Sequence, residues 1–212
     1  MLGKGGGAAS GGKARIAVLV SGGGTNLQAL IDAQDKGIIK SGEIVLVISN
    51  KAGAYALERA EKAGIKAETV LLRDAGSQED FEERLHELLS ENSIDLIVMA
   101  GFMSILSGSF TARYPDRIIN IHPSLIPSFC GKGFYGLHVH EAALEYGVKV
   151  TGATVHFVNE IPDGGRIIKQ KAVEVKDEDT PEVLQKRVME QAEWIILPEA
   201  TEEICKEIVR GK

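Results

Sequence analysis

Short apolar runs alternate with amphipathic segments through the first half of the chain. The apolar runs are rich in valine, isoleucine and leucine, and they occupy residues 16–20, 44–48, 69–72, 96–100 and 118–121. Helical periodicity, with apolar positions three and four residues apart, follows the first three runs at residues 27–35, 55–63 and 81–89. Continuously apolar strands separated by helices are typical of a parallel sheet covered on both faces. The pattern therefore predicts a doubly wound α/β domain with a mostly parallel sheet.

The second half of the chain changes to a period of two. Apolar and polar residues alternate at residues 151–158 and 167–175, and the segment between them is rich in turn-forming residues. These features predict two antiparallel strands, so the sheet should be mixed, with its antiparallel part in the C-terminal half. Thr180 followed by Pro181 predicts a helix that runs to about Trp194, and Pro198 predicts the start of a last helix that ends near Arg210.

Length and composition fit one compact domain. With 212 residues, of which 44% are hydrophobic and 25% charged, the chain can bury a core without disulfides or metals. We expect a single domain over residues 14–212, preceded by a flexible, glycine-rich tail at residues 1–13. The two cysteines, Cys130 and Cys205, lie far apart and lack metal-ligand spacing, which favours a reducing, cytoplasmic location.

Charge and hydropathy limit the possible partners. The net charge of -6 argues against the basic surface that non-specific nucleic-acid binding needs. No apolar run approaches the roughly 18 residues of a membrane span. We therefore expect small-molecule partners, no nucleic acid and no membrane, for a protein that is a monomer or a homodimer.

Glycines mark the end of the first predicted strand. Residues 21–26 read SGGGTN and lead into the first helix, at the sheet edge where open α/β folds bind ligands. Backbone N–H groups there, with Thr25 and Asn26 as side-chain donors, can enclose a phosphate. The alternative is a tight turn in which Thr25 only caps the helix. The turn lacks the GxGxxG spacing of dinucleotide sites, and a near-Walker motif at residues 7–14 lacks both the hydroxyl at Ala14 and a preceding strand.

An amide and an imidazole stand two residues apart at the end of the run at 118–121. Asn120 and His122 thus lie on one side of a strand end, followed by a loop with two prolines. The motif NIHPSLIP, with AGFM before it and VHFVNEIPDGG after it, resembles the folate-dependent formyltransferase family. The resemblance covers nearly everything from Arg15 to about Pro198, and it implies the family's Rossmann-like fold.

The resemblance also implies a catalytic trio of Asn120, His122 and Asp163. Attack of an amine on a formyl carbonyl builds negative charge on oxygen, which one positioned donor stabilises by ~3 kcal/mol. Asn120 and a protonated His122 would act as donors, while the Asp163 carboxylate would raise the pKa of His122 and help to relay the amine proton. Taken singly, each residue has a structural alternative as a strand-end turn residue, a loop histidine or an Asp-Gly turn. No metal is implied.

Motif matches imply two substrate sites beside the trio. The SGGGTNLQA start resembles the branch of the family that acts on glycinamide ribonucleotide, so Gly24, Thr25 and Asn26 would hold its phosphate and Glu193 its amine end, although a glutamate on a helix face is usually solvated. For the co-substrate 10-formyltetrahydrofolate, the implied folate-binding residues are Met103, Ser104, Ile105, Leu106, Asn120, Asn159, Glu160, Ile161, Pro162 and Asp163. Ser104 and Gln78 depart from the family because arginine is common at both positions, and the loop at residues 129–137 is longer than in compact members.

The implied reaction is formyl transfer from 10-formyltetrahydrofolate to the amine of glycinamide ribonucleotide, a step of purine synthesis. The nearest alternative is a deformylase of the same family, but such proteins carry an extra N-terminal domain. A tRNA-directed member would need a C-terminal tRNA-binding domain, and a non-catalytic folate or nucleotide carrier would need no acid–base trio. Among the other histidines, His138 and His140 lack a third metal ligand, and His86 and His156 fit surface and strand positions.

Overall fold

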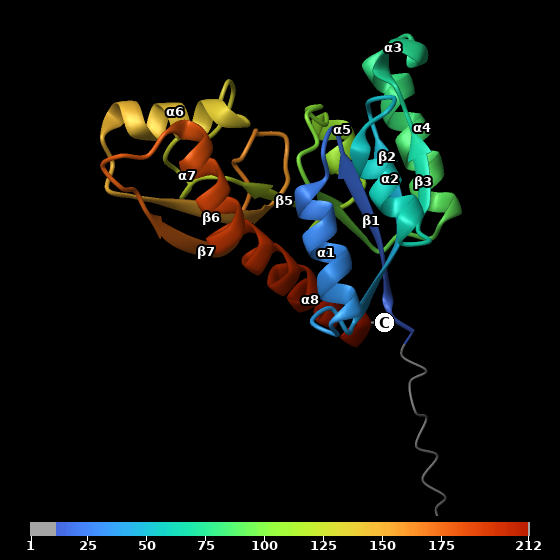
Figure 1. Ribbon diagram of the computed structural model, residues 1–212. Coiled ribbons are helices and arrows are strands. Elements are labelled where there is room, and N and C mark those ends of the chain that lie inside the picture. Colours follow the sequence, from blue (N-terminus) through green and yellow to red (C-terminus); the bar gives the residue numbers. More distant parts are fainter. Residues whose placement is uncertain (1–11, 212) are drawn as a thin grey trace, which may run out of the picture.

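The computed structural model describes residues 12–211, which are built around one seven-stranded sheet (Figure 1). The strands are β1 (Ala14–Val20), β2 (Gly42–Ser49), β3 (Lys66–Thr69), β4 (Leu96–Met99), β5 (Ile118–His122), β6 (Val150–Phe157) and β7 (Ile167–Glu174). Their order across the sheet is β3-β2-β1-β4-β5-β6-β7. Neighbours from β3 to β5 are parallel, whereas β6 is antiparallel to both β5 and β7. The predicted mixed, mostly parallel sheet is confirmed.

The strand order reverses at β1. The chain first moves outward from β1 through β2 to β3, and then crosses back to place β4 on the other side of β1. In open α/β sheets, ligands bind beyond the carboxyl ends of the strands at such a reversal. Because β1 and β4 pair in parallel, the glycine turn after β1 and the segment after β4 meet at this edge. The fold thus brings two predicted substrate-binding segments together.

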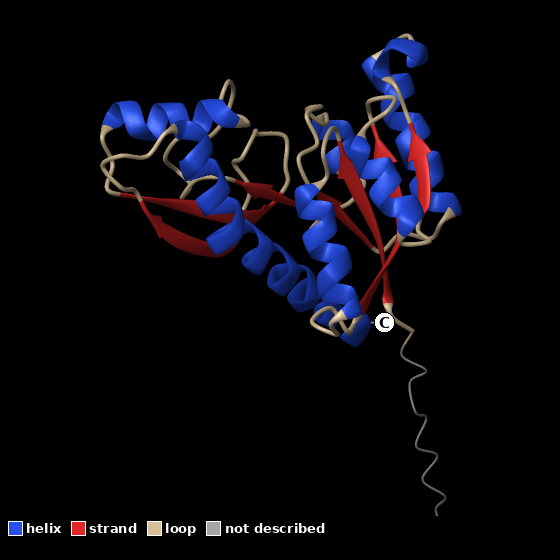
Figure 2. Cartoon of the chain, viewed as in Figure 1, coloured by secondary structure: helices blue, strands red, loops and turns tan. Residues whose placement is uncertain are grey.

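Helices cover both faces of the sheet (Figure 2). They are α1 (Thr25–Asp35), α2 (Tyr55–Lys62), α3 (Leu72–Ala75), α4 (Gln78–Glu91), α5 (Gly108–Thr111), α6 (Leu137–Tyr146), α7 (Pro181–Val188), the π-helix η1 (Met189–Glu193) and α8 (Trp194–Arg210). Residues of α1, α2, α7 and α8 share one buried cluster, and residues of α3, α4 and α5 share the other. Alternate residues of β1 supply both clusters, with Ile16 and Val18 in the first and Ala17 and Leu19 in the second.

Some elements differ from the sequence predictions. The third strand was expected at residues 69–72, but β3 ends at Thr69 and Leu72 begins α3. β3 lies at the edge of the sheet, next to β2, and it carries exposed polar residues such as Lys66. A search for apolar runs therefore does not recognise it as a strand. Helices α5 and α6 were not predicted, because α5 is a single turn and α6 follows Gly136 without any side-chain cap.

The C-terminal helices follow one another without a loop. Thr180 caps α7 as predicted, since its side chain accepts a hydrogen bond from the Val183 N–H. The prediction that Pro198 begins a helix is wrong, because α8 starts at Trp194 and contains Pro198. Proline cannot donate a backbone hydrogen bond, but here it follows a π-helical turn closely, where the hydrogen-bond spacing changes in any case.

No helix within residues 12–211 is long and apolar enough to cross a membrane. The tail predicted at residues 1–13 lies outside the described residues, apart from Gly12 and Lys13, so its flexibility stays a prediction.

Candidate active site

The glycine turn joins β1 to α1 at the point where the strand order reverses. Gly24 occupies the N-cap position with φ 70°, in the left-handed region that glycine adopts most readily. A Cβ atom at Gly24 would lie 2.6 Å from the Cβ of Ala56, so any side chain there would collide with α2. No side chain caps α1, and Thr25 is instead its exposed first residue. The interpretation of Thr25 as a cap is therefore wrong, whereas the tight turn itself is real.

Asn26 and Glu193 meet beside this turn. The Asn26 side-chain N–H group donates to Glu193 Oε2 at 2.7 Å, and the Glu193 side chain is buried rather than solvated. Burial raises the pKa of Glu193 to about 7, against the lowering effect of the Asn26 hydrogen bond. Glu193 closes the π-helical turn, a feature that often marks functional sites. The structure therefore brings Glu193, Asn26 and the glycine turn together, as the motif matches implied.

Asn120, His122 and Asp163 also come together. Asn120 and His122 lie on β5, and Asp163 reaches them from the loop between β6 and β7. Asp163 Oδ2 is 3.5 Å from His122 Nδ1 and accepts a 2.8 Å hydrogen bond from the Gly131 N–H. Asp163 has φ 56°, a left-handed conformation that aspartate tolerates better than most residues. The Asp-Gly turn is thus real, and it directs the carboxylate into the cluster.

His122 differs from the expectation in its protonation. Its Nε2 atom lies 2.8 Å from the carbonyl oxygen of Phe129, which can only accept, so Nε2 carries the proton of the neutral ring. Burial lowers the pKa of His122 and outweighs the raising effect of Asp163. The predicted raising effect of Asp163 is therefore present, but burial keeps the pKa of His122 below its usual value in the ligand-free protein. Nδ1, which faces the carboxylate, is free to take up a proton.

His156 is a member of the cluster that the sequence did not reveal. It lies on β6 opposite Asn120, almost fully buried, and its Nδ1 donates to the Phe157 carbonyl at 2.8 Å. Its Nε2 atom is 3.2 Å from Asn120 Nδ2 and 3.5 Å from Asp163 Oδ1. Burial opposes ionisation of Asp163, but the contacts with His156, His122 and Gly131 together lower its pKa. The sequence offered one signal for this role: the alternation of residues along β6, which puts His156 on a strand that pairs with β5.

The segment after β4 turns back toward the glycine turn. The Met103 N–H donates to Ser21 Oγ at 2.7 Å, and Ser104 Oγ accepts a 2.7 Å bond from Asn50, so the ends of β1, β2 and β4 are linked. Ser104 is therefore engaged within the protein, and Gln78 bonds Glu82 and the Ile105 carbonyl. Met103 and Ile105 are exposed, whereas Leu106 is buried.

The loop after β6 supplies the other predicted folate contacts. The Ile161 N–H donates to Asn159 Oδ1 at 3.0 Å, and Glu160, Ile161 and Pro162 are exposed. Ile161, Met103 and Ile105 leave apolar surface exposed in the two predicted folate segments. An apolar surface of this kind suits a flat heterocycle with polar edges.

The remaining candidate groups do not form a metal site. His138 pairs with Glu141 at 2.8 Å on the surface of α6, whereas His140 is buried on the same helix. Within residues 12–211, no group of three or more histidine, cysteine or acidic side chains is arranged to hold a metal ion. His86 lies 2.7 Å from the Tyr114 hydroxyl, away from the site.

Comparison with known proteins gives a consistent result. Residues 14–201 match the formyl transferase family. The chain is 44% identical over 184 residues to the phosphoribosylglycinamide formyltransferase of Haemophilus influenzae, covering 87% of this chain and 84% of that protein. It is 47% identical over 198 residues to the trifunctional purine biosynthetic protein adenosine-3 of Gallus gallus, covering 93% of this chain but only 19% of that protein.

Solved structures agree with these sequence matches. The glycinamide ribonucleotide transformylase 1 of Symbiobacterium toebii superposes with a TM-score of 0.86 at 43% identity, covering 92% of this chain and 89% of that one. A phosphoribosylglycinamide formyltransferase from Coxiella burnetii gives a TM-score of 0.85 at 41% identity, with the same coverage of 92% and 89%. By the match over residues 14–201 and by these relatives, the chain belongs to the formyl transferase family.

Proposed function

We propose that this chain transfers the formyl group of 10-formyltetrahydrofolate to the amine of glycinamide ribonucleotide, a step of purine synthesis. The observation that carries the proposal is the cluster of Asn120, His122, His156 and Asp163, in which both histidines are buried, at the same edge of the sheet as the glycine turn. Relatives named for this reaction match most of the chain and most of their own length. On the same basis we propose a monomer or homodimer in the cytoplasm, with no metal.

The ribonucleotide would enter through the glycine turn. Its phosphate would meet the N–H groups of the turn and the side chains of Thr25 and Asn26, while Glu193 would contact the glycinamide end. The folate would lie along residues 103–106 and 159–163, with its formyl group directed at Asn120. This arrangement holds the amine beside the formyl carbon, which converts a bimolecular step into an effectively intramolecular one.

The chemistry then runs through the cluster. The amine nitrogen attacks the formyl carbon, and negative charge forms on oxygen. The Asn120 amide stabilises this charge, and so does the His122 ring once its Nδ1 atom has taken up the amine proton. His156 Nε2 lies 3.2 Å from the Asn120 amide nitrogen, and this contact fixes the orientation of that amide. The Asp163–His122 pair takes the amine proton and returns one to the folate N10 as the carbon–N10 bond breaks.

The test follows formyl consumption by the change in folate absorbance. The protein alone should consume negligible 10-formyltetrahydrofolate, and addition of glycinamide ribonucleotide should start rapid consumption. Steady hydrolysis without the ribonucleotide would identify a deformylase. Binding of the folate without turnover under either condition would identify a carrier.

A further inference from the structure

The three glycine carbonyls of the turn are all bonded to neighbouring helices. The Gly22 oxygen accepts from the Ala56 N–H at 3.0 Å, and the Gly23 oxygen accepts from Arg59 Nε at 2.8 Å. The Gly24 oxygen accepts from the Gln28 N–H at 2.9 Å, as the first bond of α1. Ala56 and Arg59 of α2 therefore fix two peptide planes of the glycine turn from one side.

This bonding determines where the N–H groups point. In a trans peptide, the C=O of one residue and the N–H of the next lie on opposite sides of the plane. Carbonyls directed at α2 therefore leave the N–H groups of Gly23 and Gly24 directed away from it. Within residues 12–211, neither of these two N–H groups has a hydrogen-bond acceptor. The turn thus presents unpaired donors on the side opposite α2.

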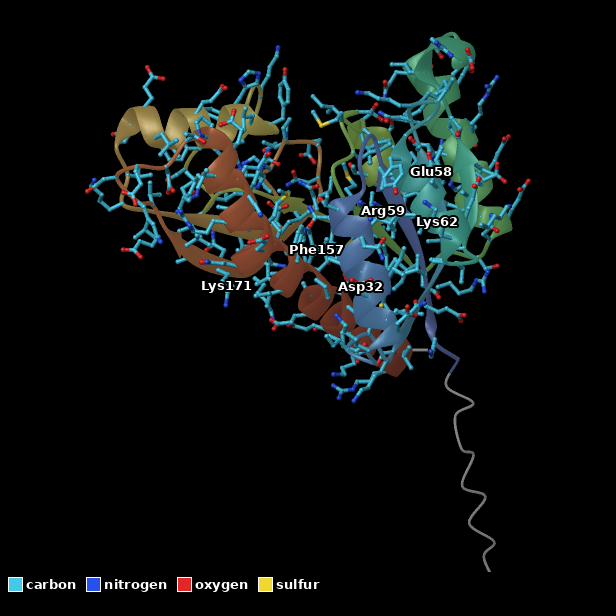
Figure 3. All side chains as sticks on the ribbon, in the orientation of Figure 1. Asp32, Glu58, Arg59, Lys62, Phe157 and Lys171 are labelled. Carbon is cyan, nitrogen blue, oxygen red and sulfur yellow. The ribbon has the colours of Figure 1, made fainter. Side chains whose placement is uncertain are left out.

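Arg59 is fixed in place but has no ion-pair partner among the described residues. Its Nη1 atom donates to Gln28 Oε1 at 2.9 Å, and its guanidinium lies 4.9 Å from the centre of the Tyr55 ring. Within the described part of the chain, no carboxylate lies within ion-pair distance of Arg59. Lys62 lies one turn further along α2 and 5.2 Å from the same ring, yet it pairs with Glu58 at 3.7 Å (Figure 3).

Arg59 also borders a hollow next to the turn. A pocket of about 300 Å³ lies between α1, α2 and the start of α8, and its lining includes Thr25, Gln28, Arg59 and Trp194. Figure 3 shows Arg59 beside α1 above Asp32, with Lys62 further from α1. The unpaired positive charge therefore lies beside both the glycine turn and Thr25, and Lys62 does not share this position.

We infer that Arg59 is a positioning residue for the phosphate of the ribonucleotide. It holds the Gly23 carbonyl toward α2, so that the turn's N–H groups face the phosphate, and it places a fixed positive charge next to the turn. Guanidinium suits this role because its fork donates to Gly23 and Gln28 at the same time, which an ammonium group on a lysine does less well. The inference rests on the proposed function for the identity of the ligand.

The test compares Arg59→Met with Lys62→Met as the matched control. Arg59→Met should raise KM for glycinamide ribonucleotide by about tenfold or more, because two charge-assisted hydrogen bonds are lost, while kcat and KM for the folate stay within about twofold. Arg59→Lys keeps the charge and should recover part of the loss. Lys62→Met should change neither KM. A rise in both KM values for Arg59→Met, or an equal effect of Lys62→Met, would overturn the inference.

A binding measurement separates this inference from the proposed function. Calorimetric titration with ribose 5-phosphate should show affinity about tenfold weaker for Arg59→Met than for wild type and Lys62→Met. Equal affinity in all three proteins would refute the role of Arg59, whether or not the wild type transfers formyl groups. If Arg59→Met melts below the assay temperature, Arg59→Lys decides instead, with a few-fold weaker affinity expected and unchanged affinity counting against the inference. Absence of formyl transfer by the wild type would reject the proposed function alone.

Discussion

Asp163 lies between two buried histidines, one on each of two neighbouring strands. Its two carboxylate oxygens face His122 and His156, each at 3.5 Å, and one of them also holds the Gly131 N–H. An amide in place of the carboxylate can still accept from Gly131, but it cannot take a proton from the substrate amine. The role of Asp163 is therefore separable from its contact with the 129–137 loop.

Asp163→Asn should lower kcat by roughly a hundredfold or more, because the group that takes the amine proton is lost. Folate affinity should change by less than about threefold, since the exposed apolar contacts remain. Removal of the carboxylate also removes the influence that raises the pKa of His122, so this pKa should fall further below its usual value. Absorbance kinetics, folate calorimetry and an NMR titration of His122 measure these three quantities.

The matched control for this substitution is Asp116→Asn. Asp116 also adopts a left-handed conformation, with φ 53°, but it is exposed and lies outside the cluster. The Asp116→Asn variant should keep the wild-type kcat. This result would exclude a general loss of activity from replacing aspartate by asparagine at a position with positive φ. Near-normal turnover of Asp163→Asn would show that Asp163 is not the proton acceptor.

Glu193 should make stability depend on pH. Its folded pKa of about 7 lies above the usual 4.5, so its contribution to stability is present below 4.5 and is lost as pH rises through 7. The difference between these two pKa values corresponds to a change in the free energy of unfolding of roughly 3 kcal/mol at most. Glu193→Gln keeps an acceptor for Asn26 but cannot ionise, so its free energy of unfolding should not show this loss.

Denaturant unfolding of wild type and Glu193→Gln between pH 4.5 and 8 measures the effect as a difference between two curves. His122 and His140 have lowered pKa values, so they make the free energy of unfolding rise with pH, opposite to the effect of Glu193. Both proteins share this contribution, and subtraction of one curve from the other removes it. The two curves should diverge between pH 4.5 and 7. Parallel curves would mean that Glu193 is ionised at little cost.

At the scale of elements, periodicity predicted the central strands well because they are buried on both faces. Ile16, Val18 and Leu19, for example, have no exposed surface, so an apolar run is their only feasible pattern. The same reasoning misplaced β3, which is paired on one side only, and missed α6, whose start has no capping side chain. Local signals fail where a neighbouring element, rather than the segment itself, decides the conformation.

The candidate site was predictable to a different extent. Asn120, His122 and Asp163 follow from motifs, and the structure places them within one cluster. Motifs did not reveal His156, because its role depends on pairing between β5 and β6. Nor did they show that Glu193 is buried, since its position depends on a π-helical turn packed against α1. Contacts between distant segments decide both of these properties.

Across the whole molecule, the two buried clusters lie on opposite faces of one sheet, and β1 contributes residues to both. β1 begins at Ala14, which is fully buried and donates its N–H to the Ser41 carbonyl at 2.8 Å. Gly12 and Lys13 are exposed, and a Cβ atom at Gly12 would meet nothing within 4 Å. The packed part of the described chain therefore begins at residue 14.

Deletion of residues 1–12 should accordingly leave both the melting temperature and kcat unchanged, because the packed part of the described chain begins at residue 14. Deletion of residues 1–16 is the matched control. It also removes Ala14 and Ile16, whose side chains are fully buried in the cluster on the α1 face, and it should lower the melting temperature by several degrees or prevent folding. Thermal unfolding and formyl-transfer kinetics of the two shortened proteins measure the outcome. A loss of several degrees or of most turnover in the shorter deletion would show that the leading segment contacts the folded domain, which would reject its prediction as a flexible tail.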